Sequence, residues 1–209
     1  MTRIILVRHG QTEWNRVERF RGRADVPLNE TGLAQALVTG RRIADEWLPM
    51  TVYSSPLSRA VKTAEVIARH LDLSIRVHPG LIDIDYGQWE GLTPDEVRVR
   101  WPEMIDSWYN TPASIRMPGG ETLADVRARA METVNEVVDC HGGQTVVIVG
   151  HTVINRIILL GVLGLSNDRF WRLRQDTCAI NSFEAEGGDF TLVSLNDTFH
   201  LRSEMQHRL

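Results

Sequence analysis

Two histidines stand at matching positions in this sequence, each close behind an apolar run rich in β-branched residues. The run 4–7 leads into Arg8-His9-Gly10, and the run 146–149 leads into Gly150-His151-Thr152. Such runs predict buried strands, and ligands in open α/β sheets bind just past the carboxyl ends of the strands. If both strands run parallel in one sheet, the two imidazoles converge on one ligand.

Two arginines could hold an anion beside these histidines. Arg8 directly precedes His9, and Arg59 falls in the first turn of a helix predicted over 57–71. The macrodipole disfavours a cation at that end of a helix, whereas a phosphate there would be bound by the free N–H groups and by Arg59. A surface position for Arg59 is the alternative. Thr152 is predicted to cap the helix that follows, leaving its first N–H groups free for the same anion.

Two carboxylates, Asp83 and Asp85, stand two residues apart in a segment that is predicted to be extended. Side chains at this spacing point the same way in extended backbone. A carboxyl group inside a pocket has its pKa raised by burial and can then donate a proton. A pair of solvated loop acids is the alternative interpretation.

The loops after the first strand are candidate pocket walls. Asn15 ends a polar stretch that has no apolar period, which is typical of a site loop. The basic segment 20–28 is interpreted either as a solvated loop or as one wall of an anion pocket, with Gly22 allowing a close approach of the backbone. Both interpretations of this segment stay open at the level of the sequence.

The apolar periodicity predicts alternating strands and helices that would place these residues. Strands are predicted at 3–8, 52–55, 73–77, 144–149, 179–184 and 190–195, and helices at 29–47, 57–71, 93–108, 123–140 and 153–163. We interpret the segment at about 88–118 as a cap over the site. The sequence shows no repeat or linker, so we expect one domain over 1–209, with a polar, poorly ordered end from Arg202.

Composition excludes several classes of function. The net charge of −4 and pI of about 6.0 argue against nucleic-acid binding. No apolar run approaches the roughly 18 residues that span a bilayer, and the run 4–7 is too short for a signal peptide. Cys140 and Cys178 are too few for a disulfide scaffold, and no cluster has the spacing of metal ligands. We expect a cytoplasmic protein with reduced thiols, no metal and no cofactor; a homodimer is left open.

These residues resemble the histidine phosphatase superfamily, which includes the cofactor-dependent phosphoglycerate mutases. The resemblance covers nearly the whole chain, and five motifs in the right order make it specific. The motifs are Arg8-His9-Gly10 with Asn15, Ser55-Pro56-Leu57-Ser58-Arg59-Ala60 with Thr63-Ala64, Tyr86-Gly87-Gln88-Trp89-Glu90-Gly91, Pro118-Gly119-Gly120-Glu121 and Val149-Gly150-His151-Thr152. The closing segment 196–201 is also similar.

The resemblance implies an α/β fold: a three-layer α/β/α sandwich around a mostly parallel sheet with one antiparallel strand. It implies that His9 is the nucleophile and that the phosphoryl group is held by Arg8, Arg59 and His151. Substrate contacts are implied or expected for four further residues: Asn15, Gly22, Tyr86 and Thr152. The proton donor of the family is usually a glutamate, but this chain has Asp83 there, one methylene shorter. Asp85 matches a different family position.

The resemblance also implies a metal-independent phosphomonoesterase that hydrolyses a small phosphorylated metabolite through a phosphohistidine on His9. A phosphoglycerate mutase-type isomerase is the first alternative. The mutases that this sequence resembles carry a longer basic insertion between the motif at Tyr86 and the motif at Pro118, which favours hydrolysis here. A non-catalytic phosphate-binding protein is the second alternative. Phosphoserine, a sugar phosphate, a phosphoglycerate and a cobalamin-precursor phosphate are open as substrates.

Overall fold

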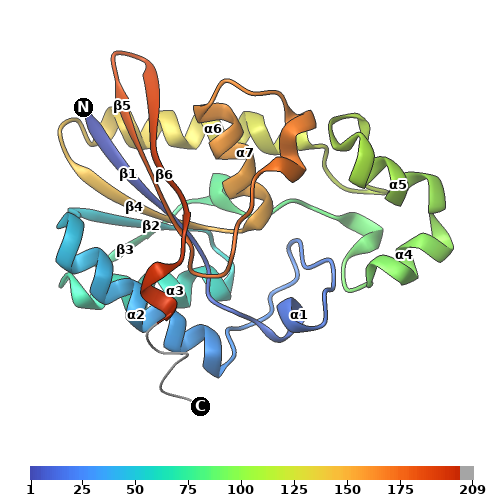
Figure 1. Cartoon of the computed structure of the whole chain (residues 1–209), viewed down its shortest axis with the longest axis horizontal. Helices are drawn as coiled ribbons and strands as arrows, with labels where there is room; N and C mark the ends of the chain where they lie inside the picture. Colours follow the sequence, from blue (N-terminus) through green and yellow to red (C-terminus); the bar gives the residue numbers. More distant parts are fainter. Residues whose placement is uncertain (203–209) are drawn as a thin grey trace.

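A six-stranded sheet with the order β3-β2-β4-β1-β5-β6 forms the centre of the protein, which we describe from a computed structural model of residues 1–202 (Figure 1). The strands are β1 (Thr2–Arg8), β2 (Thr51–Ser54), β3 (Ile75–Val77), β4 (Thr145–Gly150), β5 (Ile180–Glu186) and β6 (Asp189–Asp197). β1 to β4 run parallel, and β5 runs antiparallel to both β1 and β6. The predicted sheet, mostly parallel with one antiparallel strand, is confirmed. Except for Arg202, the predicted poorly ordered end lies outside the described residues.

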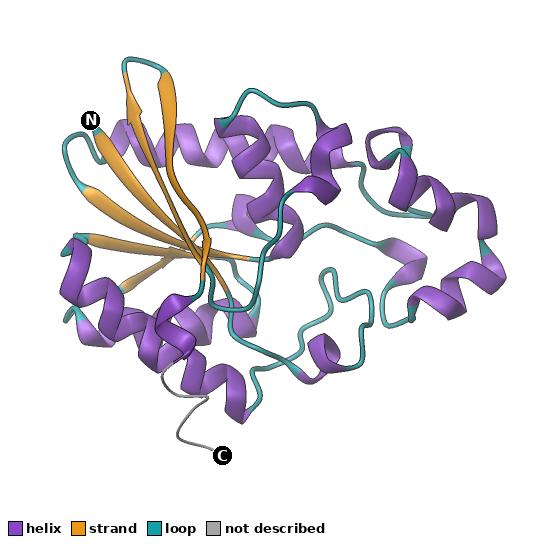
Figure 2. Cartoon of the chain, viewed as in Figure 1, coloured by secondary structure: helices purple, strands orange, loops and turns teal. Residues whose placement is uncertain are grey.

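Helices cover both faces of the sheet, as Figure 2 shows. The long helices are α2 (Glu30–Trp47) and α3 (Ser58–His70) on one face, and α6 (Leu123–Cys140) and α7 (Thr152–Val162) on the other. The alternation of β1 explains the two cores, because successive side chains of a strand point to opposite faces. Ile5 and Val7 pack in the core with Ile43 of α2, while Ile4 and Leu6 pack in the other core. The three-layer architecture is therefore confirmed.

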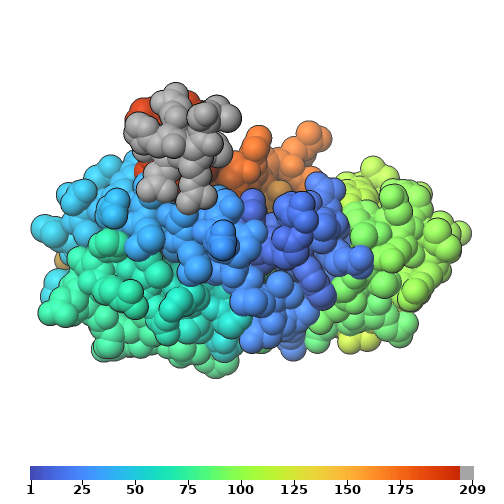
Figure 3. All heavy atoms as spheres, turned by 90° about the horizontal axis from the view of Figure 1, so that it is seen from below, coloured from blue at the N-terminus to red at the C-terminus, as the bar shows by residue number. Residues whose placement is uncertain are grey.

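The cap contains two short helices, α4 (Pro94–Arg100) and α5 (Pro102–Asn110), beyond the carboxyl ends of the parallel strands. The single helix predicted over 93–108 is wrong. Proline disfavours helical backbone in the residue before it, and Trp101 has φ −139° and ψ 65° before Pro102. On the face shown in Figure 3, the loop after β1 lies against the cap. Phe20 of that loop contacts the rings of Tyr86 and Trp89.

Shorter helical turns connect these elements. They are the helix α1 (Glu13–Arg16) and the 3₁₀ turns Pro79–Leu81, Gly87–Trp89, Pro112–Ser114, Asn167–Arg172 and Phe199–Leu201. No described helix is long and apolar enough to cross a membrane. Cys140 and Cys178 are free thiols, as expected.

Candidate active site

The carboxyl ends of β1 and β4 bring the two histidines together. The strands are adjacent and parallel, and Arg8 lies opposite Gly150 in their register. The next residue of each chain segment is a histidine, and the ring centroids of His9 and His151 lie 5.1 Å apart. The expected convergence of the two side chains at one sheet edge is confirmed.

The tautomer of His9 follows from its hydrogen bond. Its Nδ1 lies 2.6 Å from the carbonyl oxygen of Gly10, and a carbonyl oxygen only accepts hydrogen bonds. Nδ1 therefore carries the proton, which leaves the lone pair of the neutral ring on Nε2. Burial, followed by the charges of Arg59 and Arg8, holds the pKa of His9 well below its usual value. The ring is neutral near pH 7, with Nε2 able to act as a nucleophile.

Arg59 is fully buried, so the alternative of a surface arginine is wrong. Its Nη1 and Nη2 donate hydrogen bonds to the carbonyl oxygens of Ala24 and Gly22, at 2.7 and 2.8 Å. The segment 20–28 is thus a wall of the site rather than a solvated loop. Arg59 Nε donates to Nδ1 of His151 at 3.2 Å, which leaves Nε2–H of His151 to donate to Ser55 Oγ at 2.7 Å. These hydrogen bonds hold the guanidinium of Arg59 and the imidazole of His151 in a fixed relative position.

Asp83 and Asp85 do not share a site. Asp83 is buried, its Oδ1 has no hydrogen-bond partner among the described residues, and its Oδ2 lies 3.8 Å from Arg59 Nη2. Burial raises the pKa of Asp83, although the charge of Arg59 opposes this shift. Asp85 instead accepts a hydrogen bond from the Gly87 N–H at 2.8 Å and pairs with Arg23 at 3.3 Å. Asp83 lines the cavity described below and Asp85 does not, so the structure places the two carboxylates in different surroundings.

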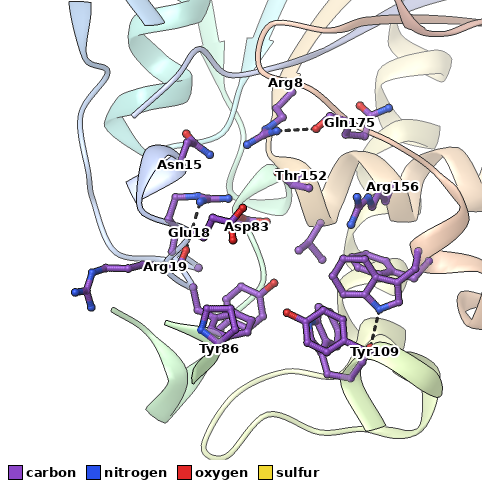
Figure 4. Close-up of a pocket in the computed structure, with 18 residues that line it drawn as sticks. Arg8, Asn15, Glu18, Arg19, Asp83, Tyr86, Tyr109, Thr152, Arg156 and Gln175 are labelled. Atoms are coloured by element: carbon purple, nitrogen blue, oxygen red, sulfur yellow. Dashed lines mark hydrogen bonds between the residues drawn. The ribbon is translucent and has the colours of Figure 1, made fainter. Parts of the chain in front are cut away.

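A cavity of about 360 Å³ opens beside these groups (Figure 4). Six of the nine predicted site residues line it: Arg8, Asn15, Gly22, Asp83, Tyr86 and Thr152. The other three, His9, Arg59 and His151, are buried and do not line it, and Arg59 contacts the lining residues Asp83 and Gly22. Arg8 Nη1 donates to the carbonyl oxygen of Gln175 at 2.6 Å, and burial, then Arg21 and Arg156, lower the pKa of Arg8 to about 9. Arg8 is still a cation at neutral pH.

Two of the lining residues differ in detail from expectation. Thr152 does not cap α7, because His151 occupies the N-cap position and Thr152 is the first helical residue. Its buried hydroxyl has no hydrogen-bond partner among residues 1–202, and the residue lines the cavity. The side-chain oxygen of Asn15 accepts hydrogen bonds from Thr12 at the start of α1. Asn15 therefore holds its own loop as well as lining the cavity.

The cavity also contains functional groups that the sequence interpretation missed. Arg21 and Arg156 line it, as does an aromatic wall of Trp108, Tyr109, Phe170 and Trp171. The guanidinium of Arg156 lies 4.9 Å from the ring centres of both Phe170 and Trp171. Arg156 follows Thr152 by four residues on α7, and this helical spacing could have identified it.

The cavity is built to accept negative charge. Within the described part of the chain, Arg8, Arg21 and Arg156 form no ion pair, and Arg59 approaches only Asp83. Burial lowers the pKa of each of these arginines, and the nearby carboxylates offset only part of this shift. A bound dianion such as a phosphoryl group would supply a partner of opposite sign. Residues 1–202 contain no group of three or more side chains placed to hold a metal ion.

Comparisons with known proteins agree with this geometry. A relative from Hydrogenobacter thermophilus, named phosphoserine phosphatase 1, is 36% identical over 201 residues, which cover 96% of this chain and 95% of the relative. Another, from Bartonella henselae, is named 2,3-bisphosphoglycerate-dependent phosphoglycerate mutase and is 33% identical over 171 residues, covering 79% and 83% of the two chains. Several other relatives carry phosphatase names.

The solved structure of Bacillus stearothermophilus YhfR has the same fold, with a TM-score of 0.90 and 33% identity over 97% of this chain and 100% of that one. Residues 4–198 match the sequence model of the histidine phosphatase superfamily, branch 1. That range runs from β1, through the paired histidines and the cap, to the end of β6. The chain therefore belongs to the histidine phosphatase superfamily.

Proposed function

We propose that the protein is a metal-independent phosphomonoesterase that hydrolyses a small phosphorylated metabolite through a phosphohistidine on His9. One observation carries the proposal: His9 has its proton on Nδ1 and a free lone pair on Nε2, within a cluster of buried cations beside a cavity. A phosphoryl group in transfer needs this arrangement of a nucleophile and positive charge. The phosphatase names of the relatives support the same reaction class.

The first step forms the phosphohistidine. His9 Nε2 attacks phosphorus while Arg8 and Arg59 hold the equatorial oxygens, together with His151 once its Nε2–H exchanges Ser55 Oγ for a phosphoryl oxygen. The P–O bond to the leaving group breaks, and Asp83 gives its proton to that oxygen, so that a neutral alcohol departs. The raised pKa of Asp83 favours the protonated form that this step needs.

The second step returns the enzyme to its starting state. A water molecule attacks the phosphorus of the phosphohistidine, and the carboxylate of Asp83 takes up the proton that the water loses. The N–P bond breaks with its electron pair returning to Nε2 of His9, and inorganic phosphate leaves. This is covalent catalysis in two steps, with one residue acting first as acid and then as base.

The length of the cap segment favours hydrolysis over isomerisation. Between the turn at 87–89 and the loop at 118–121, the chain has room for α4, α5 and one 3₁₀ turn, whereas the mutases that the sequence resembles carry a longer basic insertion. The relative named as a mutase keeps that reaction as the second candidate. The aromatic wall of the cavity and Arg156 could accommodate leaving groups of several kinds, apolar as well as anionic. The cytoplasmic location stays a prediction, and the physiological substrate and a homodimer stay open.

A hydrolysis screen in the presence of EDTA tests the proposal. Phosphomonoesters are supplied beside 3-phosphoglycerate, and both inorganic phosphate and isomerised product are measured. We expect phosphate release without added metal, loss of turnover in His9→Ala, and normal turnover in His70→Ala, a control at an exposed histidine of α3. An alkaline quench during turnover should trap a phosphoryl group on the wild type but not on His9→Ala.

Other outcomes would change the assignment. Isomerisation without phosphate release would support the mutase, and the absence of both products would support a phosphate-binding protein. Normal turnover in His9→Ala would refute the nucleophile.

A further inference from the structure

Arg129, in the middle of α6, uses every N–H of its guanidinium to hold the loop that carries Asp83. Nη1 donates to the carbonyl oxygens of Gly80 and Ile82, at 3.0 and 2.6 Å. Nη2 donates to the carbonyl oxygen of Asp83 itself, at 3.1 Å. The remaining two bonds, from Nη2 and Nε, go to the two carboxylate oxygens of Glu121, at 3.0 and 3.1 Å. An arginine has five N–H donors in a rigid fork, and here all five are used.

Glu121 ties the other end of the same loop. Its Oε2 accepts a hydrogen bond from the Asp85 N–H at 2.9 Å, and its own N–H donates to the Asp85 carbonyl oxygen at the same distance. Arg23 adds ion pairs to Glu121 and to Asp85, at 3.2 and 3.3 Å. The backbone from Gly80 to Asp85 is therefore bound at four residues to one Arg–Glu pair.

The carboxyl group of Asp83 has weaker support than its backbone, from the N–H of Ile84 and the charge of Arg59. Its Oδ1 has no hydrogen-bond partner among the described residues, and Oδ2 lies 3.8 Å from Arg59. The placement of this short side chain consequently depends on the placement of its backbone. A proton donor must lie within hydrogen-bond reach of the leaving oxygen, so the backbone anchor decides whether Asp83 can act.

We propose that Arg129 is a positioning residue for proton donation, holding the backbone of Asp83 so that its carboxyl group reaches the leaving oxygen of the substrate. The inference rests on the proposed function, because it assigns Arg129 a share in that reaction's first step. Arg129 touches neither the cavity nor the paired histidines. We therefore expect its effect at the steps in which Asp83 gives or takes up a proton, of which kcat/KM reports the first.

Leaving-group dependence separates this role from a merely structural one. Phenyl phosphate and p-nitrophenyl phosphate have similar shapes, and both suit the aromatic wall of the cavity. Phenolate is the more basic leaving group and needs the proton, whereas p-nitrophenolate departs without it. The value of kcat/KM reports the phosphorylation step for both substrates, whichever later step limits kcat.

Arg129→Lys is the first variant, because lysine keeps the charge but offers a compact ammonium in place of the fork. We expect kcat/KM for phenyl phosphate to fall about tenfold, within the range that general acids contribute. For p-nitrophenyl phosphate we expect a change of less than about twofold, because the missing proton matters little there. Glu121→Gln, which weakens the same anchor, should change the ratio of the two substrates in the same direction and gives a second route if Arg129→Lys folds poorly.

Arg127→Lys is the matched control. Arg127 lies on the same helix and also binds a backbone carbonyl oxygen, that of Leu165 at 2.6 Å, together with Asn167 Oδ1 at 3.0 Å. These contacts are remote from Asp83. We expect Arg127→Lys to leave the ratio of the two substrates at the wild-type value, even if it lowers the melting temperature.

A double-mutant cycle with Asp83→Asn completes the test. Asp83→Asn alone should lower kcat/KM for phenyl phosphate by about a hundredfold or more. In that background Arg129→Lys should add less than about twofold, because residues that act as a unit are not additive. Equal losses on both substrates in Arg129→Lys and Glu121→Gln, or full additivity with Asp83→Asn, would overturn the inference. Failure of the wild type to release phosphate from either substrate would instead refute the proposed function.

Discussion

Replacing Gly22 with alanine tests how closely the wall of the cavity approaches the cap. Gly22 has φ +49°, in the left-handed region, and its carbonyl oxygen accepts a hydrogen bond from Arg59. A Cβ atom there would lie 2.2 Å from Glu90 Oε1 and 2.9 Å from the Ile84 carbonyl oxygen. Glu90 has little freedom to move aside, because the same Oε1 accepts a hydrogen bond from the Arg23 N–H at 2.7 Å.

Two costs add in Gly22→Ala. A left-handed backbone costs a non-glycine residue about 1–2 kcal/mol, and forcing an extra methyl group into a packed site costs about 1–3 kcal/mol. We therefore expect the free energy of unfolding to fall by about 2–5 kcal/mol. Displacement of the Gly22 carbonyl should also disturb Arg59 and lower kcat/KM for any phosphomonoester that the wild type hydrolyses.

Gly187→Ala is the control that isolates the close approach. Gly187, in the turn between β5 and β6, has φ +61° and no heavy atom within 4 Å of an added Cβ. Gly187→Ala therefore has the cost of the left-handed backbone without the cost of a steric clash. Alanine lowers the conformational entropy of the unfolded chain equally in both variants. Urea unfolding followed by circular dichroism should therefore show Gly22→Ala to be less stable than Gly187→Ala by about 1–3 kcal/mol. Equal stabilities, or wild-type stability in Gly22→Ala, would refute the reasoning.

Two further predictions concern stability. Trp108→Ala removes a fully buried side chain that packs on Phe170, and should lower the free energy of unfolding by about 3–5 kcal/mol in urea titrations; a loss below about 1 kcal/mol would contradict the burial. Lowering the pH from 7.5 to 5.5 should also destabilise the protein, because burial lowers the folded-state pKa of His9 and His151 well below the usual value and that of His200 to about 4. Below about pH 6.5 the unfolded state therefore binds more protons than the folded state. The free energy of unfolding then falls by up to about 1.4 kcal/mol per pH unit for each of these histidines. The slope from unfolding curves should decrease in His200→Gln, and a stability independent of pH in this window would contradict the shifts.

The centre of the site could be predicted from sequence because two simple regularities determine it. Apolar β-branched runs give buried strands, and parallel neighbours bring their carboxyl ends to one edge. His9 and His151 need no further information to meet. Arg59 was predicted in the first turn of its helix for the same reason, since the start of α3 is visible in the apolar period.

The environment of Asp83 could not be predicted in this way. Asp83 and Asp85 each stand between two apolar or aromatic residues, so the local sequence does not distinguish them. Their surroundings differ because they contact different residues that are remote in sequence. Arg129 and Glu121 come from α6 and the loop before it, and Arg23 comes from the loop after β1. Nothing in the segment itself distinguishes a buried proton donor from a residue of a turn.

The cap contains a sequence signal that the prediction did not use. Pro102 indicates a break, whereas the prediction of one helix over 93–108 rested on the helical pattern alone. The aromatic wall depends on a 3₁₀ turn at Asn167–Arg172, which is too short to leave a periodic pattern. Its Trp171 reaches the site because Nε1 donates to the Trp108 carbonyl oxygen at 2.7 Å.

The place of β1 in the sheet has a consequence for synthesis. Residues 2–8 lie between β4 and β5, so their strand partners are residues 145–150 and 180–185. The ribosome synthesises this apolar strand long before either partner strand exists. Strand pairing over such long sequence separations is slow, and the hydrophobic surface of β1 is exposed until it forms. The catalytic histidine proposed here follows β1 directly, so it is translated before the strands β4 and β5 that complete its surroundings. Hydrolysis would thus begin only when synthesis of the sheet is finished, and an aborted nascent chain would carry the nucleophile without the enzyme.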